Sequence, residues 1–199
     1  RAVRADSTNH HLLQEAAERS LRAKKYSRAM HYLQTLVKRG DDPDHFRLLA
    51  ILYMMTKESD KAIAVLDSAE VRLGKIEFFS RMRQQIYLES GDNKKALNSA
   101  VELVNEAPYD PANHISLADV YAAMGADSFA EATYNTAINL DKTNSDSWFS
   151  YASFLDRRKR HTEMLLVWRN IIDLQSVPLS SKIAIVESVT SKRDFYRKN

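Results

Sequence analysis

The sequence predicts an all-helical protein built from repeated pairs of helices. Glycine and proline number only four each among 199 residues, so few positions interrupt a helix. The interruptions recur at a fixed interval: Gly40 and Gly74 lie 34 residues apart, and so do Gly91 and Gly125. Turns that recur at a constant spacing are typical of a protein made of stacked structural repeats.

The same breaking residues define where each helix begins and ends. Pro108 continues the 34-residue interval from Gly74, and Pro43 and Pro111 lie two intervals apart. Proline suits the first turn of a helix, where its missing amide proton would have had no partner. We therefore expect helices over 8–22, 26–38, 44–56, 59–73, 77–90, 93–106, 112–124, 127–140, 145–158, 161–174 and 179–191.

Small and aromatic residues keep the same phase between the breakers. Two such series are Ala62, Ala96 and Ala130, extended by Ala29 and Met164, and Tyr53, Tyr87 and Tyr121, continued by Leu155. A small residue lets two helix backbones approach, and a large residue four positions later, such as Leu66 or Tyr134, fills the gap on the same face. One helix pair leaves an apolar face open, so neighbouring pairs must stack.

The segment 115–141 resembles the tetratricopeptide repeat (TPR). The matching positions are Ile115, Leu117, Ala118, Tyr121, Gly125, Ala130, Tyr134, Ala137 and Leu140. Units at 9–42, 43–76, 77–110, 111–144 and 145–178 share the pattern, the first more loosely. The resemblance implies a right-handed α-solenoid of antiparallel helix pairs, with residues 1–199 forming one array of about five TPR units.

The ends of the array and its third unit depart from this regular pattern. Residues 179–191 have apolar positions at helical spacing, so we expect a capping helix, followed by a further element or tail at 192–199. Ser80, Arg83 and Gln84 make the first helix of the third unit polar. We expect that helix either to pack less tightly or to contact a partner.

The resemblance also implies where a partner binds, because the first helix of each TPR pair lines the concave side of the array. The site residues predicted on this basis are Arg47, Ile51, Met54, Met55, Phe78, Arg81, Gln85 and Phe149. Arg47 and Arg81 are 34 residues apart, and two adjacent guanidinium groups suit a carboxylate on a bound peptide. The alternative is that both arginines are solvated or pair with acidic neighbours in the array.

Chaperone-binding members of the TPR family hold a C-terminal carboxylate with a set of lysine, asparagine and arginine residues. That set is not present, because Ile51 and Gln85 stand where asparagine is expected. We therefore do not expect a chaperone-tail receptor.

The sequence contains no recognisable catalytic motif. It has no cysteine, no GxGxxG phosphate loop and no GxSxG elbow. Its six histidines are scattered, and the adjacent His10 and His11 point to different helix faces. His114 shares a series with Phe46 and Trp148, which indicates packing and not acid–base chemistry. We predict no enzyme activity, no metal and no cofactor.

Charge is distributed unevenly along the chain. Residues 101–150 hold eight acidic residues against one lysine, whereas both flanks are net basic. An acidic centre interrupts the continuous basic stripe that nucleic-acid binding requires, so we predict no nucleic-acid partner. The densest basic run, 157–160, lies at a helix end, where cations are favourable; an anionic partner is the alternative.

The sequence leaves the cellular location open between the cytoplasm and the periplasmic side of a bacterial outer membrane. No run of about 18 apolar residues is present, so we expect no direct membrane insertion. Residues 1–4 lack the apolar part of a signal peptide, and the abrupt ends indicate a fragment. Residues 177–182 and 194–198 are similar to the segment after the repeats in bacterial outer-membrane-associated TPR lipoproteins.

The predicted function is a protein–protein interaction scaffold that binds a peptide or partner protein in the concave groove. The alternative is a regulatory or assembly module of a longer protein whose activity lies elsewhere. An all-helical enzyme would need a converging acid, base or metal set, which the sequence does not show. Assembly into a homo-oligomer is left open.

Overall fold

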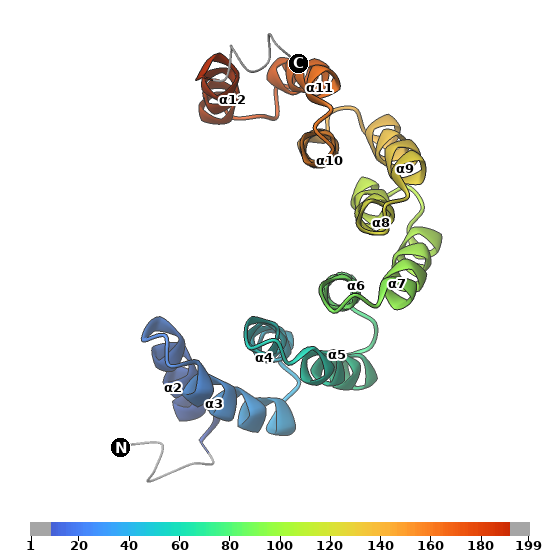
Figure 1. The fold of residues 1–199 in the computed structure, drawn as a ribbon. Coiled ribbons are helices and arrows are strands. Elements are labelled where there is room, and N and C mark those ends of the chain that lie inside the picture. Colours follow the sequence, from blue (N-terminus) through green and yellow to red (C-terminus); the bar gives the residue numbers. More distant parts are fainter. Residues whose placement is uncertain (1–8, 192–199) are drawn as a thin grey trace. The chain divides into compact units, whose positions relative to one another are not determined.

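The computed structural model describes residues 9–191, and the tail predicted at 192–199 lies outside the described residues. Every regular element within 9–191 is an α-helix, eleven in all (Figure 1). The predicted all-helical class is therefore confirmed, and the helix bounds agree with the predicted ranges to within two residues. The chain divides into two compact units, residues 1–92 and 93–199, and each is described by itself.

The first unit consists of helices that pack against one another in chain order. They are α2 (His10–Arg22), α3 (Tyr26–Arg39), α4 (Pro43–Met55), α5 (Ser59–Leu73) and α6 (Glu77–Glu89). The pairs α2–α3 and α4–α5 form helix hairpins, α3 packs on α4, and α5 packs on α6. The core between them contains the fully buried side chains of Leu33, Leu36, Phe46, Leu49 and Leu66.

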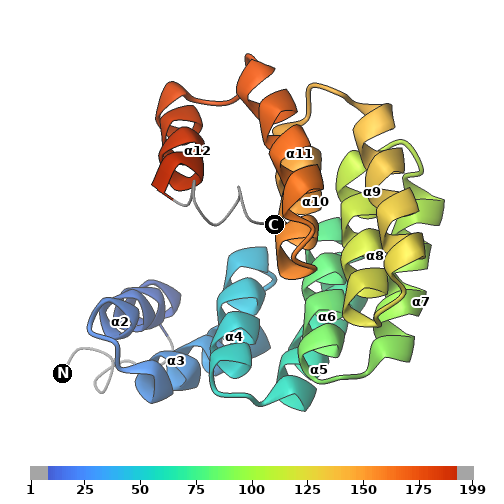
Figure 2. The same ribbon diagram turned by 45° about the horizontal axis from the view of Figure 1, so that its top comes forward.

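The second unit repeats this arrangement with six helices. They are α7 (Asn93–Glu106), α8 (Pro111–Ala123), α9 (Asp127–Leu140), α10 (Ser145–Arg157), α11 (His161–Asp173) and α12 (Leu179–Ser191). The hairpins α8–α9 and α10–α11 lie side by side in both views, and α10 contacts both helices of the preceding hairpin (Figures 1 and 2). The boundary between the two units falls inside the predicted repeat 77–110, between α6 and α7.

Four first helices begin at a capping side chain: Asn9 caps α2 through the amide of Leu12, and the other three caps repeat with the sequence period. Asp42 and Asp110 each accept a hydrogen bond from the backbone amide two residues on, and Pro43 and Pro111 come next in the first turn. Asn144 caps α10 in the same way, through the amide of Ser147. These side chains satisfy amide protons that a helix start leaves without partners.

Five first helices end in the same turn, in which one residue has a positive φ. That residue is Lys24, Lys57, Gly91, Gly125 or Lys159, with φ between 54° and 79°. In each turn this residue donates its amide to the carbonyl three positions earlier, and the next residue donates to the carbonyl five positions earlier. This is the Schellman arrangement, and its acceptors include Tyr53, Tyr87, Tyr121 and Leu155, the second series found in the sequence.

The series of small residues lies at the tightest contacts between helices. Ala29, Ala62, Ala96, Ala130 and Met164 are all 0% exposed. The large residues expected four positions later are buried as well: Leu66 and Tyr134 are 0% exposed, and Trp168 packs partly buried against the core of the second unit. The alternation of size that the sequence predicts is the packing that the structure has.

The helix α6, the polar first helix of the predicted repeat 77–110, buries two of its polar side chains and forms one cluster of ion pairs. Ser80 and Gln84 on α6 are 5% and 3% exposed. Arg83 reaches across to α5, where its Nη2 lies 2.5 Å from Glu70 Oε2 and 3.3 Å from Asp67 Oδ1. These polar residues of α6 therefore take part in the packing of the first unit.

The helix predicted to cap the array forms, but a different face of it is buried. Leu179, Ile183 and Val186 are 72%, 48% and 47% exposed, although their spacing indicated a packed face. Ile185 is the position of α12 that joins the core of the second unit. The apolar spacing thus predicted the helix correctly but not the face that packs.

Candidate protein-binding surface

The predicted site residues lie on three first helices. Arg47, Ile51, Met54 and Met55 are on α4, and Phe78, Arg81 and Gln85 are on α6, so these seven belong to the first unit. Phe149, on α10, belongs to the second unit and is 37% exposed. Seven of the eight predicted residues therefore lie on two first helices of the first unit, α4 and α6, and together with Phe149 they stay a prediction.

Both predicted arginines hold a carboxylate of their own helix. Arg47 donates to Asp44 Oδ1 at 2.9 Å, and Arg81 donates to Glu77 Oε1 at 2.5 Å. Gln85 likewise donates its side-chain amide to Glu89 Oε1 at 2.8 Å. The charge of each arginine is thus largely balanced before any partner arrives, which is the alternative that the sequence left open.

The apolar members of this surface differ in their exposure. Met55 and Phe78 are 57% and 49% exposed, whereas Met54 is partly buried against the core of the first unit. The Phe78 ring also lies 6.1 Å, centroid to centroid, from the buried ring of Phe79. Met55 and Phe78 are therefore the side chains of this set that offer apolar contact to a partner.

A hollow of about 160 Å³ opens between α2, α3 and α4, and sequence reasoning found only one of its side chains, Arg47. The lining residues are Gln14, Ala17, Glu18, Leu21, Leu33, Asp42, Asp44, His45, Arg47 and Leu48. The hollow has an apolar floor and a rim of three carboxylates. Only the packing of α2 beside α4 brings Glu18 and Asp42 to the same hollow, so no spacing in the sequence could have indicated it.

His45 is the buried polar side chain of this hollow. The side chain is 4% exposed, and its Nε2 lies 3.7 Å from Asp42 Oδ2. Its Nδ1 has no hydrogen-bond partner among the residues that the structure describes. Burial lowers the pKa of His45, although the nearby carboxylate of Asp42 acts in the opposite direction. The lowered pKa favours the neutral ring at neutral pH.

A second, wider hollow of about 380 Å³ lies between α3, α4 and α5. Leu49 and Tyr53 line it from α4, with Lys38 on the α3 side and Lys61 on the α5 side. Tyr53 accepts a hydrogen bond from Gln34, and Lys61 is bound to Glu58. Gln34, Tyr53 and Lys61 are thus engaged within the first unit.

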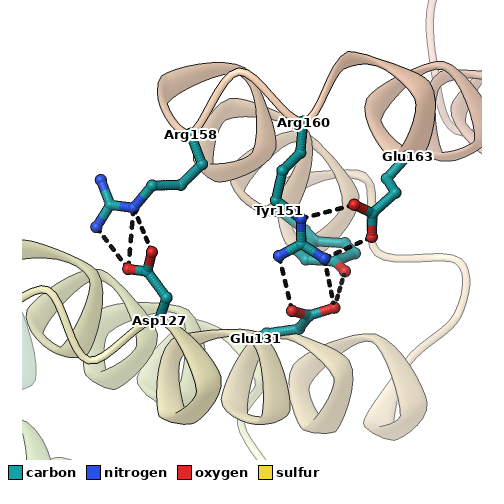
Figure 3. Close-up of polar contacts among 6 residues, drawn as sticks. All are labelled: Asp127, Glu131, Tyr151, Arg158, Arg160 and Glu163. Atoms are coloured by element: carbon teal, nitrogen blue, oxygen red, sulfur yellow. Dashed lines mark hydrogen bonds and ion pairs between the residues drawn. The ribbon is translucent and has the colours of Figure 1, made fainter.

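The basic run 157–160 is bound to the acidic helices of the preceding hairpin. Arg158 forms a bidentate pair with Asp127, at 2.7–2.9 Å (Figure 3). It also donates to the carbonyl oxygen of Ala122. Arg157 Nη2 lies 3.5 Å from Asp119 Oδ1. The expected explanation by the helix end is therefore incomplete, because these arginines join neighbouring helix pairs.

Arg160 is held between two glutamates. Its guanidinium lies 2.7 Å from Glu131 Oε2 on α9 and 2.5 Å from Glu163 Oε2 on α11, while Tyr151 donates to Glu131 at 2.9 Å (Figure 3). The hydrogen bonds from Arg160 lower the pKa of Glu131, and burial with the Glu131 contact raises the pKa of Tyr151 to about 12. These hydrogen bonds and ion pairs connect α9, α10 and α11.

The histidines do not assemble into a metal site in the part of the chain that the structure describes. No group of three His, Cys, Asp or Glu side chains there is placed to hold a metal ion. His10 instead lies beside His45, with ring centroids 5.4 Å apart. A ring nitrogen of His114 lies 2.8 Å from the carbonyl oxygen of Pro108, and Trp148 donates to the equivalent carbonyl of Lys142, so both fix a loop.

Among residues 9–191, no helix has the length and apolar character needed to cross a bilayer. The lipoprotein resemblance of 194–198 falls on residues outside the described range.

Comparison with solved structures identifies the fold. MamA, from residue 41 to its end, of Desulfovibrio magneticus RS-1 matches with a TM-score of 0.61 and 18% identity, over 84% of this chain and 97% of that one. TTC0263, a thermophilic TPR protein of Thermus thermophilus, matches with 0.58 and 22%, over 77% and 85%. YrrB, a TPR protein described as having an unusual peptide-binding site, matches with 0.54 and 12%, over 87% and 90%. The predicted TPR solenoid is thereby confirmed.

A search of curated proteins finds no match. A family profile matches residues 2–148, about three quarters of the chain, and its description is ChAPs, the Chs5p-Arf1p-binding proteins. The helix hairpins and the TPR fold are consistent with this match. The chain belongs to the ChAPs family.

Proposed function

We propose that the chain is a protein–protein interaction scaffold and that a peptide or partner protein binds the first unit on the side of its first helices. The observation that carries the proposal is the exposure of two large apolar side chains, Met55 at the end of α4 and Phe78 at the start of α6. Exposed methionine and aromatic side chains are common at protein-binding surfaces. The polar rim is supplied by Arg47, Arg81 and Gln85, each already positioned by a carboxylate.

The family name supports a protein as the partner, since ChAPs proteins are described as binding Chs5p and Arf1p. It also favours a scaffold over the alternative, a regulatory or assembly module of a longer protein. The described residues contain no group of three side chains placed to hold a metal ion. We propose in addition that the sequence ranges 9–42, 43–76, 77–110, 111–144 and 145–178 correspond to five TPR units.

The contribution of Met55 and Phe78 to binding can be tested by replacing both apolar side chains with charged ones. The double variant Met55→Glu with Phe78→Glu places two charges on exposed positions, so the fold is expected to persist while capture of the native partner falls at least tenfold. Capture is measured with the immobilised chain and quantitative mass spectrometry of proteins from the native organism. Val71→Glu is the matched control, because Val71 is 86% exposed on the second helix α5.

Arg47→Glu with Arg81→Glu tests the polar rim separately. Each reversal sets two carboxylates side by side on one helix, which costs only a few tenths of a kcal/mol per pair. Loss of capture with unchanged helicity supports this surface. Full capture by both double variants, together with loss in the Val71→Glu control, places the binding surface on the second helices and refutes the proposal.

A further inference from the structure

The hollow between α2, α3 and α4 has the shape and walls of a pocket for a slender side chain. Ala17 and Leu33 form its buried floor, and Leu21 and Leu48 are partly buried against the core of the first unit. These apolar side chains share the hollow with the carboxylates of Glu18, Asp42 and Asp44. A lysine side chain has the complementary form, with an apolar four-carbon stem and a compact ammonium group.

The charges around the hollow favour a cation. Three carboxylates and one guanidinium line it, and the guanidinium of Arg47 is bound to Asp44 at 2.9 Å. Glu18 lies 3.2 Å from Arg22, in a pair whose arginine side chain is 76% exposed. The carboxylate of Asp42 has no lysine or arginine within ion-pair distance in the described part of the chain. The rim therefore keeps negative charge at Asp42.

His45 places a buried ring beside Asp42 in the same hollow. Its ring is held with Nε2 toward Asp42 at 3.7 Å, which favours a proton on Nε2 and a lone pair on Nδ1. Nδ1 is buried and finds no donor among the described residues. Because Nε2 and not Nδ1 faces Asp42, a cation placed beside Asp42 also lies close to Nε2 of His45.

We propose that this hollow binds a lysine side chain of the partner protein. The inference rests on the proposed function, because it assigns the chemistry of one contact of the same scaffold. The ammonium group brings the positive charge that Asp42 lacks, and the stem packs on Leu21 and Leu48. The site therefore selects a basic residue on the partner, in contrast to the acidic peptide that Arg47 and Arg81 suggested.

The test is an NMR titration of the full chain with Nα-acetyl-lysine N-methylamide. The norleucine counterpart has the same stem without the charge, and the Nε-acetyl-lysine counterpart is neutral but polar. The readouts are the ring nitrogens of His45 and the backbone amides of Glu18 and Asp42. We expect the lysine probe to shift all of them and the two neutral probes to leave the His45 nitrogens unchanged.

Asp42→Asn is the decisive variant, because asparagine keeps the N-cap of α4 while the charge is removed. We expect it to weaken lysine binding by about fivefold, the upper range for a partly exposed ion pair. Glu15→Gln is the matched control: Glu15 pairs with Arg19 on α2 as Glu18 pairs with Arg22, but it does not line the hollow.

Equal shifts from the norleucine probe show a merely apolar hollow and overturn the inference, as does an absence of shifts over millimolar probe concentrations. A lysine response that Asp42→Asn leaves intact also overturns it. Partner capture that persists while the lysine probe fails refutes only this site. A lysine response without any partner capture refutes the proposed function and leaves the site standing.

Discussion

The five equivalent turns after the first helices predict that Lys57→Gly stabilises the protein. Lys57 has a φ of 60°, in the left-handed region, while the same position of the next two turns is Gly91 and Gly125. The Lys57 side chain is exposed and forms no hydrogen bond or ion pair among the described residues, so its removal loses no contact. The backbone geometry of the turn is kept, because both Schellman hydrogen bonds use main-chain atoms.

Two opposing effects set the magnitude of this change. A side chain in the left-handed region costs about 1–2 kcal/mol relative to the right-handed region. Glycine increases the freedom of the unfolded chain, which offsets about 0.4–1 kcal/mol of that gain. We therefore expect the free energy of unfolding to rise by about 0.5–1 kcal/mol, and the midpoint temperature by about 2–4 °C per kcal/mol for a chain of this size.

Urea unfolding followed by far-ultraviolet circular dichroism measures the change. Lys57→Ala is the control, because it removes the same charge and stem but keeps a Cβ at positive φ. Gly125→Ala is the converse variant: a Cβ built there meets no atom within 4 Å, so any loss of stability comes from φ alone. If Lys57→Gly is no more stable than Lys57→Ala, backbone strain at these turns is refuted.

Burial and charge lead to three further predictions. Leu66→Ala, at a fully buried position, is expected to lower the free energy of unfolding by about 2–5 kcal/mol, whereas Val71→Ala, at an exposed one, changes it little; calorimetry compares them. Ala96→Glu places a charge at a 0% exposed position and is expected to abolish cooperative thermal unfolding; a wild-type transition contradicts the packing role of that series. The lowered pKa of Glu131 stabilises the fold above the pH at which a glutamate of the unfolded chain ionises, about 4.3, and this contribution is lost as the pH falls through the lowered value. Glu131→Gln is therefore expected to flatten the acid limb of the curve of unfolding free energy against pH. An unchanged acid limb contradicts the ion pair.

The helices could be predicted from the sequence because backbone breakers act locally. A proline after a capping aspartate, as at Asp42–Pro43, and a glycine at positive φ, as at Gly125, determine the ends of a helix whatever packs on it. Three of the five turns use lysine at the glycine position, which no local pattern indicates, yet the 34-residue period placed those turns correctly. Periodicity carried information that residue type alone did not.

The candidate site was less accessible to sequence reasoning, because side-chain partners depend on contacts between helices. Arg47 and Arg81 occupy equivalent positions, but each has an acidic residue three or four positions earlier, which binds it first. That spacing was visible in the sequence and favours a pair within the helix. The meeting of Glu18, Asp42 and His45 was not visible, since it depends on how α2 and α4 pack around α3.

The uneven charge of the sequence has its explanation in the second unit. The acidic stretch 101–150 supplies Asp119, Asp127 and Glu131 on α8 and α9, and the basic run at the end of α10 supplies the arginines that bind them. Acidic and basic residues that are separate in the sequence thus contact one another between successive helix pairs. An arginine held by a bidentate carboxylate must lose that pair before it can bind an anionic ligand. The basic run therefore joins the repeats of the second unit, and binding of an acidic partner by these arginines would come at the expense of the contact between those repeats.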